Sequence, residues 1–75
     1  MANAQNRTTD PGYENRDGQI VVRNTRKQGT DFGQHIYELR CKHCGEVYGA
    51  NESDIYERKC PACQGGRPGI PVERM

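Results

Sequence analysis

Large apolar side chains are scarce in this chain of 75 residues. Tryptophan is absent, leucine and phenylalanine occur once each, and valine, isoleucine and tyrosine occur four times each. Burying one large apolar side chain contributes about 1.5–3 kcal/mol, whereas ordering one residue costs about 1.5 kcal/mol. A hydrophobic core alone therefore cannot stabilise a fully ordered chain. We expect a single small domain that depends on another source of stability, with part of the chain disordered.

Long hydrophobic runs are also missing. No stretch of about eighteen apolar residues is present, so the sequence predicts no transmembrane helix and no membrane partner. The opening residues, MANAQNRTTDPGYENRDG, lack the apolar segment of a secretory signal. We therefore expect a cytoplasmic protein in a reducing environment, where structural disulfides are rare.

The sequence also lacks an excess of charge of one sign. Eleven Lys and Arg stand against ten Asp and Glu, which gives a net charge of +1. Such a balance produces no field over the whole protein that would attract nucleic acid or an anionic membrane. Any binding to nucleic acid must therefore depend on a local basic patch.

The sequence does contain four cysteines, arranged as two Cys-x-x-Cys pairs. CKHCG holds Cys41 and Cys44, and after fifteen intervening residues CPACQG holds Cys60 and Cys63. Each pair bends the chain around one metal ion, and two pairs supply the four thiolates that tetrahedral Zn²⁺ prefers. We predict one structural Zn²⁺ ion, with Gly45 in a left-handed conformation that leaves its N–H free for sulfur.

Other uses of the cysteines stay open at this point. A thioredoxin-like redox motif lacks its βαβ frame here, two disulfides need an oxidising compartment, and a rubredoxin-like iron site uses similar pairs. A catalytic zinc site keeps an open position, which four cysteines would close. His35 and His43 are alternative ligands, but because the cysteine set is complete we expect both on the surface.

Strand and turn patterns surround the cysteine pairs. The segments 19–23 (QIVVR), 35–41 (HIYELRC) and 46–49 (EVYG) predict short strands, and a polar loop with glycines separates the first two. In the second strand, alternation places Tyr37, Leu39 and Cys41 on one face. The segment 50–59 suits one helical turn with Asn51 or Ser53 as its cap. We expect a flexible tail over 1–18, from which Tyr13 docks, a domain over 19–67 and an extended tail over 68–75.

The stretch HIYELRCKHCGEVYG, followed by ERKCPACQGG, resembles the zinc-ribbon family of small β-hairpin modules. The resemblance covers 34–66 and implies a mainly β, metal-stabilised fold in which the four cysteines ligate one zinc ion. Zinc ribbons serve in transcription factors, ribosomal proteins, polymerase subunits and assembly adaptors. The resemblance therefore implies no single function.

Two binding functions compete on these observations. The first is a protein-interaction module, an adaptor or subunit of a larger assembly, whose N-terminal arm and C-terminal GGRPGIPVERM tail order on binding. The second is nucleic-acid binding, with Tyr37, Tyr48 and Tyr56 as stacking surfaces. Its basic patch would consist of Arg23, Arg26, Lys27, Arg40, Lys42, Arg58, Lys59 and Arg67. We expect no enzyme activity and no small-molecule substrate, because the chain has too little interior to build a catalytic pocket.

The glycine-rich GGRPG segment, 65–69, follows the second cysteine pair. Its backbone N–H groups suit an anion, with Arg67 assisting, although the lysine and helix of a phosphate-binding P-loop are absent. The simpler interpretation is that these glycines let the chain pass close to the metal site.

Overall fold

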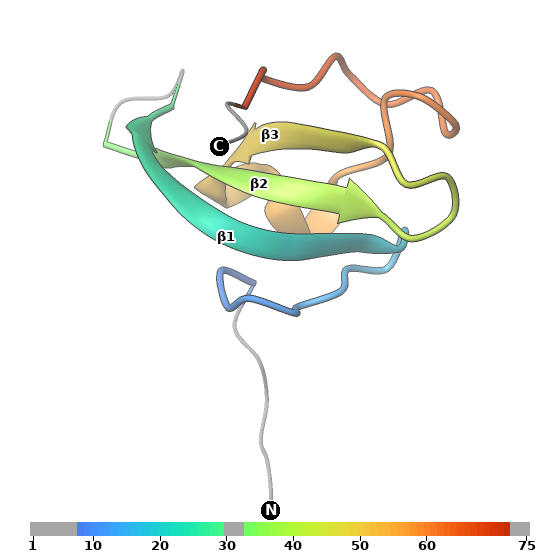
Figure 1. Ribbon diagram of the computed structural model, residues 1–75, viewed down its shortest axis with the longest axis horizontal. Helices are drawn as coiled ribbons and strands as arrows, with labels where there is room; N and C mark the ends of the chain where they lie inside the picture. The colour runs from blue at the N-terminus through green and yellow to red at the C-terminus, as the bar shows by residue number, and fades with distance from the viewer. Residues whose placement is uncertain (1–7, 30–32, 73–75) are drawn as a thin grey trace, which may run out of the picture.

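The structure is a computed structural model that describes residues 8–29 and 33–72. Its sheet contains three antiparallel strands in the order β1-β2-β3: β1 is Gln19–Gln28, β2 is His35–Cys41 and β3 is Val47–Asn51. A 3-10 helix, η1 (Glu52–Glu57), follows β3 and lies against one face of the sheet (Figure 1). This arrangement confirms the predicted small, mainly β fold with one short helical turn.

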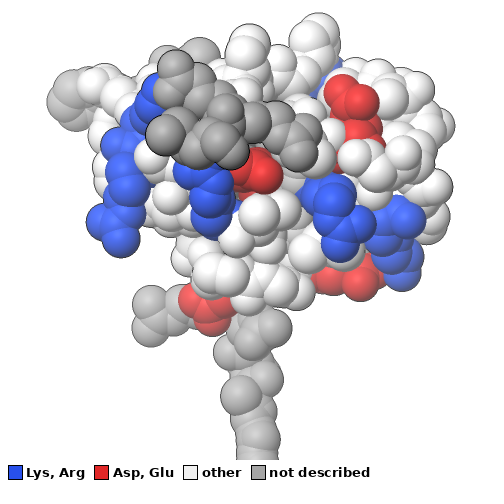
Figure 2. Space-filling view, viewed as in Figure 1, with Lys and Arg blue, Asp and Glu red and all other residues white. Residues whose placement is uncertain are grey.

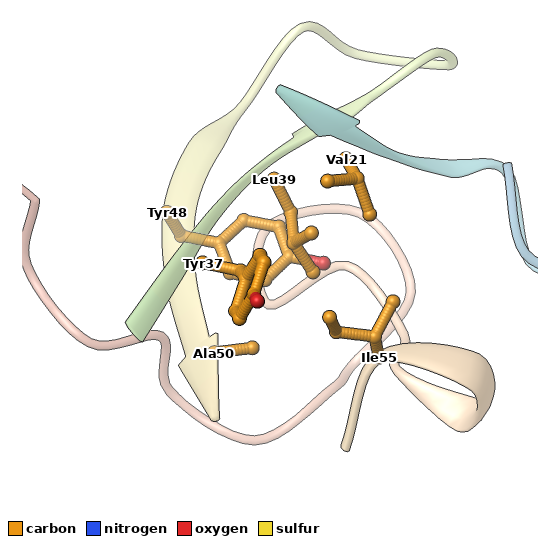
Figure 3. Close-up of a cluster of buried hydrophobic side chains, with 6 residues drawn as sticks. All are labelled: Val21, Tyr37, Leu39, Tyr48, Ala50 and Ile55. Atoms are coloured by element: carbon orange, nitrogen blue, oxygen red, sulfur yellow. The ribbon is translucent and has the colours of Figure 1, made fainter. Parts of the chain in front are cut away.

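The hydrophobic core lies between the sheet and η1. It consists of the buried side chains Val21, Tyr37, Leu39, Tyr48, Ala50 and Ile55 (Figure 3). In β2 the buried residues alternate with more exposed ones, so Tyr37, Leu39 and Cys41 share the inward face as predicted. Tyr13 packs against this cluster from the segment before β1, which confirms its expected docking. Such a small set of side chains agrees with the shortage seen in the sequence.

Strand β1 is longer than the sequence indicated. We expected a strand over 19–23 and then a polar loop, but β1 continues to Gln28. Its polar side chains pair with β2: the Thr25 hydroxyl donates to the Ile36 carbonyl over 2.6 Å, and Arg23 lies 2.9 Å from Glu38. Cross-strand hydrogen bonds and ion pairs replace apolar packing here, so hydrophobic periodicity did not reveal the extension. The loop residues 30–32 lie outside the described part of the chain.

The helical turn forms without the predicted side-chain cap. Asn51 occupies the N-cap position of η1, yet its side chain makes no capping hydrogen bond. Ile55 is fully buried against the sheet, so packing rather than capping holds the turn in place. Among the described residues, no helix is long and apolar enough to cross a membrane.

The segment before β1 is bonded to the sheet from Gly12 onward, where the Gly12 N–H donates to the Val21 carbonyl over 2.8 Å, although the sequence indicated a tail over 1–18. Asn15 is 4% exposed, and its side-chain amide donates to the carbonyls of Ile55 and Arg58 over 2.7 and 2.9 Å. Its side-chain oxygen accepts from the N–H groups of Asp17 and Gln19. One buried asparagine therefore attaches this segment to the end of η1, while residues 1–7 lie outside the described range.

The segment after the cysteine pairs returns along β3 (Figure 1, orange to red). Gly49 and Ile70 exchange hydrogen bonds of 2.7 and 2.9 Å across an isolated bridge. Gly69 allows the close approach, because a Cβ there would lie 2.5 Å from Cβ of Tyr48. Within the predicted tail 68–75, residues 68–72 therefore include a contact with the sheet edge, and residues 73–75 lie outside the described range.

We predict that Asn15→Ala lowers the free energy of unfolding by at least about 2 kcal/mol, because each buried polar group left without a partner costs about 1–3 kcal/mol. Urea denaturation followed by circular dichroism measures the change. Asn24→Ala is the matched control, since its hydrogen bonds lie nearer the surface, and it should cost less. Equal losses in the two variants would show that Asn15 does not anchor the segment.

Candidate metal centre

The end of β2 and the following turn position the first cysteine pair. Cys41 is the last residue of β2, and its N–H donates to the Glu46 carbonyl over 2.9 Å, which closes the turn. Gly45 has φ +82°, as predicted. Its N–H donates to the Cys41 carbonyl over 2.8 Å rather than to a sulfur, so that part of the prediction was wrong.

The second pair forms a tight turn after η1. The N–H groups of Ala62 and Cys63 lie 3.3 and 3.4 Å from Sγ of Cys60. The Cys60 carbonyl accepts from the N–H groups of Gln64 and Gly66 over 3.2 and 3.0 Å. These bonds close the turn that holds Cys60 and Cys63.

The four cysteine sulfurs converge on one point. The Sγ atoms of Cys41, Cys44, Cys60 and Cys63 all lie within 4.8 Å of one another. Sγ of Cys41 lies 3.7 Å from that of Cys63, and Sγ of Cys44 lies 3.6 Å from that of Cys60. Sulfurs placed about 2.3 Å from a central ion at tetrahedral corners are about 3.8 Å apart, whereas a disulfide bond measures about 2.05 Å. The cysteines are therefore free thiols whose arrangement fits one metal ion.

Neither histidine joins this group. In the described residues, the metal-binding cluster consists of the four cysteines alone. His43 instead packs against Gly18, where an added Cβ would lie 2.7 Å from its Nε2 atom. His35 opens β2, at the opposite end of the strand from Cys41.

The surroundings of the sulfurs favour one thiolate before any metal binds. Burial acts to raise the pKa of Cys41, but hydrogen bonds from the Gln19 side chain and from the N–H groups of Cys44 and His43 lower the pKa to about 6. Burial, followed by hydrogen bonds with the other cysteines, raises the pKa of Cys63 to about 12. A divalent cation held by the four cysteines would supply positive charge that favours the thiolate form of the remaining thiols, and their protons would be released.

A partly buried network of amide side chains supports both cysteine pairs, and the sequence did not reveal it. The side-chain oxygen of Gln64 accepts from the Cys60 N–H over 2.7 Å and from Gln19 Nε2 over 3.2 Å. Gln64 Nε2 donates to the Asp17 carbonyl over 2.9 Å. The Gln19 oxygen accepts from the Tyr48 hydroxyl over 2.7 Å. Because Gln19 pairs with Cys41 in the β-ladder, the network joins the two pairs; the one available signal was a glutamine directly after Cys63.

The predicted basic residues do not form one patch. Arg23, Lys42 and Arg67 lie in ion pairs with Glu38, Glu14 and Asp54, at 2.9, 2.7 and 3.6 Å respectively. Arg58 is 6% exposed, and its guanidinium lies over the Tyr48 ring, 5.1 Å from the centroid. Arg40 and Lys59 are exposed near the cysteines. Several of the expected cations are thus paired or buried.

Arg26 and Lys27 lie far from the basic residues beside the cysteines. They are close to the Gln28–His35 end of the β1–β2 ladder, whereas Cys41 pairs with Gln19 at the other end. At about 3.3 Å per residue, a ten-residue strand spans roughly 30 Å. On the face of the molecule seen in Figure 2, Lys and Arg lie in separate places, with Asp and Glu between them.

The tyrosines proposed for base stacking occupy different environments. Tyr37 and Tyr48 belong to the core, with 8% and 4% of their surfaces exposed. Tyr56 is 54% exposed. Two of the three rings therefore cannot stack on bases in this conformation.

Comparison with protein-family models finds no match, and comparisons with curated proteins and with solved structures likewise find none. The metal-binding interpretation therefore depends on the arrangement of the residues in this chain.

We predict that Gln64→Ala weakens metal binding about 10- to 100-fold, the usual effect of removing a residue that orients metal ligands. Competition with a chromophoric chelator measures the change in affinity. Gln28→Ala, at an exposed glutamine, is the control and should bind metal as the unaltered protein does. Unchanged affinity in Gln64→Ala would show that the amide network does not support the ligands.

Proposed function

We propose that this protein is a non-catalytic zinc-binding module of the zinc-ribbon type that acts by binding a protein partner. One Zn²⁺ ion held by Cys41, Cys44, Cys60 and Cys63 would join the β2 end to the segment after η1. The observation that carries the proposal is the separation of 3.6–3.7 Å between sulfurs of the first pair and sulfurs of the second, which matches the edges of a zinc tetrathiolate.

Thiolate chemistry supports zinc as the bound ion. Soft sulfur ligands in a tetrahedral set select Zn²⁺ or iron, and hard cations such as Mg²⁺ require oxygen ligands. The same four sulfurs favour a structural role, because a catalytic zinc ion usually has three protein ligands and one open position. Metal analysis separates zinc from iron in the purified protein.

Charge placement favours a protein partner over nucleic acid. One of the proposed cations, Arg58, is buried, and the exposed ones are divided between the two ends of the sheet. Nucleic-acid binding gains most of its free energy from several phosphates neutralised together, which needs cations on one face. Protein contacts have no such requirement.

The sheet offers a contact surface on the face that η1 leaves open. Ile20, Arg40 and Val47 form one row across β1, β2 and β3, because Arg40 pairs with both neighbours in the ladder. These side chains point away from the core, since Leu39 and Tyr48 point into it. Two half-buried apolar residues around one exposed arginine resemble the composition of protein interfaces, where arginine is enriched.

We predict that removing the metal unfolds the protein. Metal binding by such peptides contributes about 10–16 kcal/mol, most of which is folding free energy, and the core here is small. A strong chelator should abolish the dispersion of the amide NMR signals, and one equivalent of Zn²⁺ should restore it. Cys60→Ser removes one buried ligand, so one equivalent of Zn²⁺ should not restore the dispersion of its amide NMR signals. Dispersed spectra after complete chelation would contradict the proposed structural role.

We predict that partners captured by the tagged full-length protein from a lysate of its native cells survive nuclease treatment and are lost with Arg40→Glu. Reversal of the charge disrupts the row on the open sheet face, whereas Arg26→Glu changes an exposed cation at the distant end of β1 and should leave capture unchanged. Quantitative mass spectrometry measures the recovery of each partner. Partners lost on nuclease treatment would support nucleic-acid binding instead.

A further inference from the structure

A cavity of about 250 Å³ lies between the end of η1 and the segment that follows the second cysteine pair. Its lining consists of Glu57, Arg58, Lys59, Gly65, Gly66 and Arg67, and we call it the Arg58 cavity. One water molecule occupies about 30 Å³ in the liquid, so the cavity has room for a small polyatomic ion and several waters. No metal ligand lines it.

Glycine is required at the floor of this cavity. A Cβ on Gly66 would lie 2.2 Å from the Lys59 carbonyl oxygen. The two backbones therefore approach each other closely, and Lys59 and Arg67 are brought to the same opening. The glycines of the GGRPG segment thus bring Arg67 close to Lys59, in addition to letting the chain pass close to the metal site.

Arg58 lines this cavity and a second one of about 130 Å³ beside it. Its side chain is fixed, because the guanidinium lies over Tyr48 and one of its terminal nitrogens donates to the Arg67 carbonyl. Only 6% of the Arg58 surface is exposed, and its buried Nε has no hydrogen-bond acceptor among the described residues. None of the ion pairs in the described structure gives Arg58 a carboxylate partner. Arg58 therefore contributes its positive charge to the cavity, whereas the exposed side chains of Lys59 and Arg67 can donate hydrogen bonds at its opening.

The charges around the cavity indicate the valence of the anion. Arg58, Lys59 and Arg67 contribute three positive charges and Glu57 one negative charge, a net charge of +2 on the lining. The carboxylate of Asp54, outside the lining, offsets one of these charges until an anion displaces it from Arg67. A phosphate monoester carries about −1.5 to −2 at pH 7, whereas a phosphodiester or a carboxylate carries about −1. The Arg67 guanidinium fork and the Lys59 ammonium also match phosphoryl oxygens.

We propose that the Arg58 cavity binds a terminal phosphoryl group, as in inorganic phosphate or a phosphate monoester. Asp54 competes for this site, because its carboxylate lies 3.6 Å from the Arg67 guanidinium. The Arg67 side chain is 71% exposed, so this ion pair is weak and the guanidinium is available to an incoming phosphoryl group.

The test is an NMR titration of the zinc-loaded, full-length protein with inorganic phosphate, and separately with O-phosphoserine and with a single-stranded oligonucleotide that lacks terminal phosphates. Phosphate and phosphoserine should produce saturable shifts at the amides of Gly65, Gly66 and Arg67, with a Kd below about 10 mM. The oligonucleotide contains diesters only and should bind at least about tenfold more weakly.

Three variants make the titration specific, and none alters a buried residue. Arg67→Gln should weaken phosphate binding about 10- to 100-fold through loss of a charged hydrogen bond. Asp54→Asn should tighten it about two- to fivefold, because the competing carboxylate is removed. Arg26→Gln removes an equal charge at the distant end of β1 and should leave the Kd unchanged.

Absence of saturable shifts would overturn the proposal, and so would equal weakening by Arg67→Gln and Arg26→Gln, which would indicate a general charge effect. Oligonucleotide binding as tight as that of phosphoserine would contradict the assignment to a dianionic group. The proposed protein partner does not enter this titration, so the phosphoryl site and the protein-binding function fail independently.

Discussion

The convergence of four sulfurs is the constraint around which the described fold is arranged. Cys41 ends a core strand, and Cys60 follows directly on the segment that closes η1, so an ion between them would join the sheet to its covering helix. Metal binding of this kind contributes about 10–16 kcal/mol, as much as the whole stability of a typical domain, about 5–15 kcal/mol. A core of only a few side chains is sufficient under that condition.

Hydrogen bonds of buried and partly buried amide side chains hold segments of this domain together, a role that apolar packing has in larger domains. Asn15 ties the segment before β1 to the carbonyls that end η1, and Gln19 and Gln64 link the strand that faces Cys41 to the Cys60 backbone. Each of these polar groups has a partner, which is the condition under which buried polar atoms stabilise a fold. The N-terminal segment and the second cysteine pair are therefore held by hydrogen bonds that run across the sheet.

Features set by local spacing were predictable from the sequence, and features set by long-range polar contacts were not. The cysteine pairs, the alternation in β2 and the turn of η1 each follow from neighbours within a few residues. The extension of β1 depends on Asn24 and Thr25, whose side chains donate hydrogen bonds to Tyr37 and Ile36 of β2, and the anchoring by Asn15 joins residues about forty positions apart. Arg58 was expected in an exposed basic patch but is buried against the Tyr48 ring. The sequence alone does not show that these two residues are in contact.

The proposed metal site and the Arg58 cavity are connected through the second cysteine pair. The tetrathiolate would fix the second cysteine pair, and the glycines after that pair bring Arg67 to Lys59 and Arg58. X-ray absorption spectroscopy of the natively purified protein tests the underlying claim most directly. A zinc edge with four sulfur neighbours at about 2.3 Å is the predicted result, and a first shell that contains nitrogen or oxygen, or fewer than four sulfurs, would contradict it.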